Sequence, residues 1–123
     1  KSNVEDFIAR ADIIKNTKII NKRICIAYSE SEISNINVVI AKAADELLNI
    51  KNVEASFILG HKNDTVFISA RSLGQINVHV LMEKLGGGGH IDIAGAQLKN
   101  VTLNQAYKKV HQIIEEYLEE ENQ

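Results

Sequence analysis

Four consecutive glycines, Gly86–Gly89, followed directly by His90, constrain this chain more than any other stretch. Glycine has no Cβ atom, so such a run reaches backbone angles closed to other residues and lets another molecule lie against the main-chain amides. Ordering a glycine also costs more conformational entropy than ordering any other residue. A run of four between two regularly patterned segments therefore needs a structural or functional reason.

The composition describes one ordinary globular domain without bulk affinity for polyanions. The 123 residues are 45% hydrophobic and 24% charged, with a formal net charge of -2. That charge argues against nucleic-acid binding by broad electrostatic attraction, so an anion site here has to be local. The single cysteine, Cys25, lies between two isoleucines, which predicts a buried structural thiol in a reducing compartment. No apolar run approaches the roughly 20 residues of a membrane span, so we expect no direct membrane contact.

Helical patterns alternate with strand patterns in the first half of the chain. Ser2 with Glu5 forms a capping-box pattern, which predicts an amphipathic helix over residues 3–15. The short apolar run at 24–28 predicts a buried strand, and the apolar spacing over 38–48 predicts a second helix. The chain starts without a methionine, so we expect a fragment of a longer protein, with this first helix at the junction to another domain.

A β-hairpin is predicted in the middle of the chain. Apolar residues alternate with more polar ones at 53–59 and again at 66–70. A polar loop at 60–64 separates the two runs, and it contains His61, which we expect to be a solvated turn residue. Two strands joined by so short a loop should pair antiparallel.

Two more helices and a strand are predicted in the second half. Asn77 is a natural N-cap for a short helix that ends at Gly86, where a C-cap glycine belongs. The small apolar stretch at 91–98 favours one helical turn followed by a strand. Thr102 with Gln105 is a second capping box, which begins a long final helix. The fold class predicted is α/β (α+β): a single domain with a mixed β-sheet and helices packed on it.

A candidate anion site combines the side chains of Ser69, Arg71 and His90 with the main chain of the glycine run. Side chains alternate along a strand, so Ser69 and Arg71 point the same way. Clustered glycine N–H groups form an anion-binding concavity, His90 can donate a charge-assisted hydrogen bond, and Arg71 can grip a phosphate bidentately. One short helix separates Arg71 from His90, which favours a shared crevice. Asp92 is close enough in sequence to orient His90.

Simpler explanations remain open for the same residues. A helix C-cap followed by a flexible connector also accounts for the glycine run, and a lone histidine beside glycines is often only packed or solvated. The run fits neither GxGxxG nor the P-loop spacing. His79 and His111 do not stand at a metal-ligand spacing from His90, so these histidines do not predict a metal site.

Four motifs follow one another in the second half of the chain. They are Ser69-Ala70-Arg71-Ser72, Asn77-Val78, Gly86-Gly87-Gly88-Gly89-His90 and Ala94-Gly95. In order and spacing they resemble the signature of the DHH-associated domain, the C-terminal lobe of DHH-family phosphoesterases. Within that family, the segments MEKLGGGGH and IAKAADELL are most similar to the corresponding segments of the membrane-anchored cyclic-di-AMP phosphodiesterases of Gram-positive bacteria. One departure is Ile93, where the family more often has alanine.

The resemblance implies two lobes with different tasks. The preceding DHH lobe would hold two manganese ions that activate water for attack on a phosphodiester, while the associated lobe closes over the substrate. Residues 1–123 would then be the substrate-binding domain, with 1–16 as a candidate interdomain helix. No DHH tripeptide is present, so the fragment should bind no metal and should be inactive alone. Its implied substrate-binding residues are Ser69, Arg71, Ser72, Gly87, Gly88, Gly89 and His90.

Three functions are compatible with these residues. The leading one is a substrate-binding lobe of a manganese-dependent phosphodiesterase that hydrolyses cyclic-di-AMP to a linear dinucleotide. The second is a lobe that grips a short oligonucleotide, as in nano-RNases and single-strand exonucleases, although aromatic residues are only 5% of the chain and offer little stacking surface. The third is a purely structural or homodimerising module, whose glycines serve only to turn the chain. We expect a cytoplasmic domain in a parent protein anchored to the cell membrane by an upstream segment.

Overall fold

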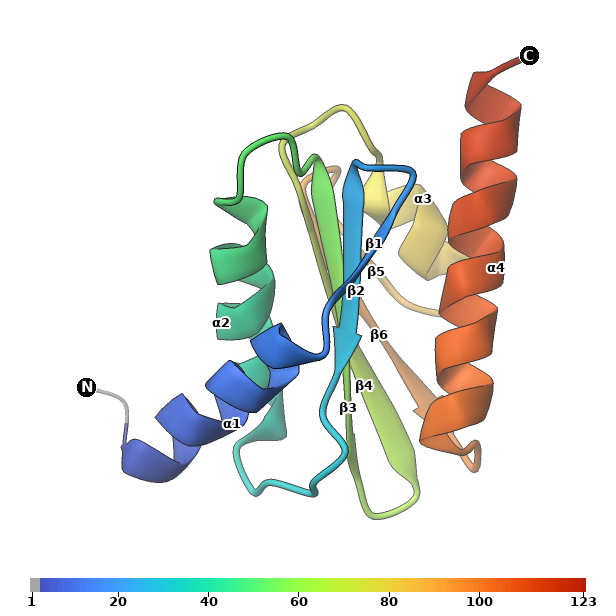
Figure 1. Ribbon diagram of the computed structural model, residues 1–123. Coiled ribbons are helices and arrows are strands. Elements are labelled where there is room, and N and C mark those ends of the chain that lie inside the picture. The colour runs from blue at the N-terminus through green and yellow to red at the C-terminus, as the bar shows by residue number, and fades with distance from the viewer. Residues whose placement is uncertain (1–2) are drawn as a thin grey trace.

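The computed structural model describes residues 3–123, in which six strands form one mixed sheet with helices on both faces (Figure 1). Helices α1 and α2 lie over one face, and α3 and α4 lie over the other. The strand order is β1-β2-β3-β4-β6-β5. The predicted class, a mixed sheet with helices packed on it, is confirmed. In chain order the elements are α1 (Val4–Lys15), β1 (Lys18–Ile20), β2 (Ile24–Tyr28), α2 (Ile36–Leu48), β3 (Ala55–Lys62), β4 (Thr65–Ser72), α3 (Val78–Glu83), β5 (Gly88–Gly89), β6 (Ile93–Lys99) and α4 (Leu103–Glu121).

Strand β2 is buried on both faces because it is the parallel neighbour of β3 and helices cover both sides. Ile24 and Ile26 pack in the core beneath α3 and α4, whereas Cys25 and Ala27 pack in the core beneath α1 and α2. Burial raises the pKa of the Cys25 thiol, which keeps it protonated and unreactive. The predicted structural thiol is confirmed.

Helix α2 packs closely on the sheet because β3 has no side chain at Gly60. A Cβ atom there would lie 2.3 Å from Cγ1 of Ile36 in the first turn of α2. Further along the helix, the buried Ser56 hydroxyl donates to the carbonyl oxygen of Ala44 at 2.7 Å. These contacts fix α2 over β3 and β4, so the outer strands β6 and β5 extend beyond the helix on that face.

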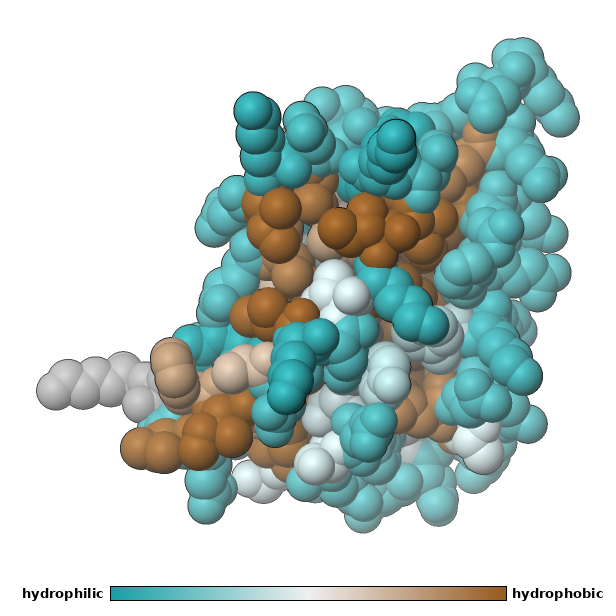
Figure 2. All heavy atoms as spheres, viewed as in Figure 1, coloured by the Kyte–Doolittle hydropathy of each residue, from teal (hydrophilic) through white to brown (hydrophobic). Residues whose placement is uncertain are grey.

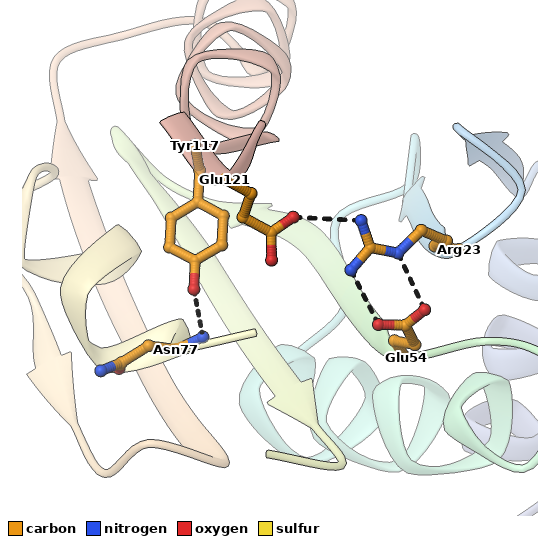
Figure 3. A network of polar contacts seen from close by, with 5 residues as sticks. All are labelled: Arg23, Glu54, Asn77, Tyr117 and Glu121. Carbon is orange, nitrogen blue, oxygen red and sulfur yellow. Dashed lines mark hydrogen bonds and ion pairs between the residues drawn. The ribbon is translucent and has the colours of Figure 1, made fainter. Parts of the chain in front are cut away.

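Helix α4 is joined to the rest of the fold by two polar contacts (Figure 3). Arg23, after the β1–β2 turn, makes a bidentate pair with Glu54, with both N–O distances 2.8 Å, and donates to Glu121 at 3.0 Å. The main-chain N–H of Asn77 donates to the Tyr117 hydroxyl at 3.0 Å. Hydrogen bonding from Arg23 lowers the pKa of the Glu54 carboxyl, so the pair is charged at neutral pH.

The predicted caps of α3 and α4 are confirmed, but the starts of α1 and α2 differ from the prediction. Helix α2 begins at Ile36, two residues before the predicted start at residue 38, because Ile36 is buried with the apolar face of the helix. Thr102 and Gln105 make the reciprocal capping box at the start of α4. In α1, however, the N-cap is Asn3, whose side chain accepts from the N–H of Asp6 at 2.8 Å. The predicted box began at Ser2, which lies outside the described residues. Asn3 fits the N-cap preference equally well, so the pattern alone left the start uncertain by one residue.

The predicted loop at 60–64 and the predicted helical turn after the glycine run were wrong, because strands extend into both segments. Strand β3 continues to Lys62, so His61 lies in the strand, with Nε2 2.7 Å from the carbonyl oxygen of Glu30, and the loop is reduced to residues 63–64. No helical turn follows the glycine run: residues 91–92 form a tight turn, and β6 starts at Ile93. Cross-strand pairing satisfies these main-chain groups better than one isolated helical turn would.

The outward face of α1 is apolar. Val4, Phe7 and Ile8 are 73%, 60% and 53% exposed, and Figure 2 shows hydrophobic side chains gathered at the α1 end of the molecule. Within residues 3–123, no helix combines the length and apolar character needed to cross a bilayer.

Candidate functional site

The glycine run begins as a helix cap. Gly86 has φ +81°, its N–H donates to Glu83 at 3.0 Å, and the N–H of Gly87 donates to Met82 at 2.8 Å. These two bonds form the Schellman motif, which satisfies the last carbonyl groups of α3. The predicted C-cap at Gly86 is confirmed. The N–H groups of Gly86 and Gly87 are therefore used by the helix cap and are not available to a ligand.

Gly88 and Gly89 then form β5, the edge strand of the sheet. Gly88 pairs with Gly95, Gly89 pairs with Ala94, and the N–H of His90 closes the turn by donating to Ile93 at 2.7 Å. The run is therefore ordered and paired, and the flexible-connector explanation does not describe it. An edge strand has main-chain groups on its outer side that no other strand covers.

Close packing or a positive φ explains three of the four glycines but not Gly88. A Cβ atom on Gly87 would lie 2.1 Å from the carbonyl oxygen of Gly95, and Gly89 has φ +146° with Ala94 Cα 2.5 Å from its Cβ position. Gly86 needs glycine for its positive φ. Gly88 has no positive φ, and a Cβ atom there would meet nothing within 4 Å. Bare backbone at Gly88 thus faces open space that the protein does not fill.

Register places Ser69 and Arg71 beside the glycine run. We call a pair of register partners on β4 and β6 a rung. Ser69 pairs with Gly95, which in turn pairs with Gly88, and Arg71 pairs with Ile93. Paired residues of an antiparallel sheet point to the same face, here the face that α2 covers only in part.

Arg71 is held by helix α2. Its Nε donates to Oδ1 of Asp45 at 3.0 Å and its Nη1 donates to the carbonyl oxygen of Ala70 at 3.0 Å. Its side chain is 13% exposed, while that of Asp45 is 64% exposed. Two of the five guanidinium N–H donors are used by these contacts. The arrangement orients the guanidinium at the edge of α2 next to the Ser69–Gly95 rung.

His90 and Arg71 lie at the same end of the sheet, because each is a neighbour of Ile93 in the β4–β6–β5 arrangement. Two strand spacings separate their backbones, about 10 Å. His90 is exposed at the hairpin turn. Within residues 3–123, no hydrogen bond or ion pair joins the Asp92 carboxylate to the His90 ring, so the predicted orienting role is not seen. The main-chain carbonyl oxygen of Asp92 instead accepts from the N–H of Ser72 at 2.9 Å.

Ser72 lies on the opposite face from Arg71. It is 5% exposed, and its hydroxyl oxygen accepts from the N–H of Gly74 at 2.9 Å. The structure therefore brings together Ser69, Arg71, the backbone of the glycine run and His90, while Ser72 closes the turn after β4.

A groove of about 510 Å³ lies along this face, between the start of α2 and the glycine run. Its size suits a nucleotide-sized ligand. Arg71 and His90 lie beyond the Ser69 end of it. Two exposed amide side chains, Asn37 and Gln97, border it; nothing in the sequence marked them, because neither belongs to a motif. The groove is lined by Asn37, Phe67, Ile68, Ser69, Gly86, Gly87, Gly95, Ala96 and Gln97.

A larger hollow of about 810 Å³ runs between α1 and the loop after β2, but its charge excludes it as the anion site. Glu5, Asp12, Glu30 and Glu32 are among its lining residues, and Lys15 is the one cation among them. These carboxylates would repel a phosphate bound in the same hollow. We call this the acidic hollow. Within residues 3–123, the acidic hollow included, no three His, Cys, Asp or Glu side chains converge on a point where a metal could bind.

The sequence model of the DHHA1 domain matches residues 16–120. The chain belongs to the DHHA1 domain family. Among curated relatives of this DHHA1 domain, the cyclic-di-AMP phosphodiesterase GdpP of Geobacillus thermodenitrificans is 42% identical over 120 residues, 97% of this chain and 18% of that protein. The bifunctional oligoribonuclease and PAP phosphatase NrnA of Thermus thermophilus is 40% identical over 72 residues, 56% of this chain and 22% of that protein.

The crystal structure of an exopolyphosphatase-related protein from Bacteroides fragilis has the same fold as this DHHA1 domain. It superposes with a TM-score of 0.79 and 21% identity, over 95% of this chain and 36% of that chain. All three proteins are longer than the DHHA1 domain, which spans 18% of GdpP, 22% of NrnA and 36% of the Bacteroides protein.

Proposed function

We propose that this DHHA1 domain binds the phosphodiester of cyclic-di-AMP for hydrolysis to a linear dinucleotide. Gly88 carries the proposal: it is the glycine of the run that neither φ nor packing explains, and open space lies before it. A phosphate oxygen can approach where any other residue would place a Cβ atom. The name of the GdpP relative supports the choice of dinucleotide.

Each neighbour of Gly88 has a distinct part in the proposed site. The Ser69 hydroxyl, level with Gly88 because both residues pair with Gly95, donates to one phosphate oxygen. Arg71 binds the same phosphate or the next one through guanidinium N–H groups that Asp45 does not occupy. His90, at the exposed turn, donates from its ring. Gly87 shapes the site by its close approach to β6, and its N–H, which donates to the carbonyl oxygen of Met82, does not contact the phosphate.

Hydrolysis needs an activated water, and the described residues do not fit a pair of manganese ions, because they offer no converging set of metal ligands. We therefore place the metal chemistry in an upstream DHH lobe of the same protein and derive no step from it here. The exposed apolar residues of α1, Val4, Phe7 and Ile8, provide a surface against which such a lobe could pack.

A second candidate is a lobe that grips the end of a short oligoribonucleotide, which the name of the NrnA relative favours. Its phosphate contacts would be the same. It differs in predicting a steep fall in affinity as salt rises, because several phosphates would release counterions. A homodimeric structural module, the third candidate, gives no reason for the open space before Gly88.

The test is hydrolysis of cyclic-di-AMP by the full-length protein after Arg71→Ala and Arg71→Lys. We expect Arg71→Ala to lower kcat/KM by about 10- to 150-fold, the loss of a hydrogen bond to a charged group. Arg71→Lys should recover only part of this, because lysine keeps the charge but not the planar fork.

Arg23→Ala is the control. Arg23 also pairs with carboxylates, those of Glu54 and Glu121, but none of these residues borders the groove or the glycine run. Unchanged turnover in Arg23→Ala together with lost turnover in Arg71→Ala supports the site. Wild-type turnover in Arg71→Ala would refute it.

A further inference from the structure

The end of the groove away from Arg71 is bordered by two amide side chains. Gln97 of β6 is the register partner of Phe67 on β4, and Asn37 lies in the first turn of α2 across the groove. Both amides are exposed, and within residues 3–123 neither has a hydrogen-bond partner in the protein. Each carries one acceptor oxygen and two N–H donors that are available to a ligand.

The Phe67–Gln97 rung lies two residues along the strands from the Ser69–Gly95 rung. That step is about 7 Å, of the order that a ribose bridges between a phosphate and its base. Phe67 is half-buried and presents apolar surface at the bottom of the groove. A ligand held by its phosphate at Ser69 and Gly88 would therefore place a base over Phe67 and between the two amides.

Amide side chains are suited to one base in particular. Asparagine and glutamine pair bidentately with adenine, accepting from its N6 amino group and donating to N7. Guanine presents two acceptors, O6 and N7, on the same edge, which arginine or lysine match better. The groove has no arginine or lysine among its lining residues.

We propose that Asn37 and Gln97 form an adenine-reading subsite, with Phe67 beneath the base, so that this end of the groove selects cyclic-di-AMP over cyclic-di-GMP. The inference rests on the proposed phosphate site at Ser69, Arg71 and Gly88. It adds specificity-determining residues that belong to no motif of the chain.

The experiment measures kcat/KM of the full-length protein for three substrates: cyclic-di-AMP, cyclic-di-GMP and bis(p-nitrophenyl) phosphate, which has a phosphodiester but no base edge. Asn37→Ala and Gln97→Ala should each lower the preference for cyclic-di-AMP over cyclic-di-GMP by about 5- to 150-fold. Hydrolysis of bis(p-nitrophenyl) phosphate should stay within about twofold of wild type. Asn104→Ala and Gln112→Ala, exposed on α4 over the other face of the sheet, are the matched controls and should change nothing.

The outcomes separate the two proposals. If Arg71→Ala lowers hydrolysis of all three substrates while the amide variants leave the preference unchanged, the phosphate site stands and the adenine subsite is wrong. If the amide variants lower all three substrates equally, they do not read the base, and the subsite is again wrong. If Arg71→Ala affects none of the substrates, the phosphate site itself fails. Loss of preference without loss of bis(p-nitrophenyl) phosphate hydrolysis supports the subsite.

Discussion

Substituting Gly88 by alanine should separate binding from folding. The added methyl group meets no protein atom within 4 Å, and φ is not positive. Replacing such a glycine raises the free energy of unfolding by about 0.4–1 kcal/mol, because the unfolded chain loses freedom. The same methyl group would stand where the phosphate approaches. A phosphate pushed away by the methyl group would lose a charge-assisted hydrogen bond to the site, which is about 1.5–3 kcal/mol. We therefore expect kcat/KM for cyclic-di-AMP to fall by about 10- to 150-fold.

Gly87→Ala is the contrasting variant one residue away. Its Cβ atom would lie 2.1 Å from the Gly95 carbonyl oxygen and 2.8 Å from Ala96 Cα. Main-chain atoms of a paired strand cannot move aside as a flexible side chain can, so we expect a cost of about 3 kcal/mol, the upper end for overpacking. For a chain of this size that lowers Tm by about 10 °C.

Thermal unfolding of the 123-residue domain and steady-state kinetics of the full-length protein, each carrying the same substitutions, test this pair. The expected result is a Gly88→Ala protein that melts at or above the wild-type Tm and has lost activity, beside a Gly87→Ala protein with a clearly lower Tm. If Gly88→Ala hydrolyses cyclic-di-AMP as fast as wild type, no ligand approaches that backbone and the reasoning fails. If Gly88→Ala melts as low as Gly87→Ala, the steric account of the run is wrong.

Three further predictions concern single contacts. Asp45→Asn removes the carboxylate that competes with phosphate for Arg71, so KM for cyclic-di-AMP should fall about two- to fivefold in steady-state kinetics; a higher KM would contradict this. Glu54→Gln removes the charge of the bidentate pair with Arg23, so it should lower the free energy of unfolding by about 1 kcal/mol at pH 7, measured by urea unfolding. Arg23 lowers the pKa of Glu54 in the folded state, so the stabilisation by this pair is fully present above pH 4.5, the ordinary pKa of the carboxyl group, and is lost as the pH falls through the folded-state pKa. A difference in unfolding free energy between wild type and Glu54→Gln that stays constant down to pH 2 would contradict this. Lys22→Gly should raise the free energy of unfolding by about 1 kcal/mol, because Asn21 and Lys22 both have positive φ in the β-turn that the Arg23 N–H closes by donating to Ile20. Lys22→Ala, which keeps the strain, should give no such gain.

Local signals predicted most of the helices because caps and apolar spacing depend on neighbouring residues alone. Asn77, Gly86 and the pair Thr102 and Gln105 each act within one turn of the helix they begin or end. The shared face of Ser69 and Arg71 follows from strand alternation, and the burial pattern of β4 agrees with it. Where two cap residues adjoin, as with Ser2 and Asn3, the sequence does not settle which one is used.

The missing features depend on contacts between distant parts of the chain. Glycine has low β-propensity, so Gly88 and Gly89 become a strand only because β6 is there to pair with them. Asp45 reaches Arg71 from 26 residues away in sequence, through the packing of α2 on the sheet. Asn37 and Gln97 come together across a groove that exists only in the folded domain. No local pattern encodes such pairings.

Hydrogen exchange of the full-length protein with and without cyclic-di-AMP tests the central claim most directly, that the phosphodiester lies against the backbone of the glycine run. The account predicts slower exchange in peptides covering residues 86–93 and 66–72. Peptides that line the acidic hollow, residues 29–34, and those of α4 should be unchanged. Saturating ligand that slows exchange only at the acidic hollow or α4, and leaves residues 86–93 as in the free protein, would contradict it.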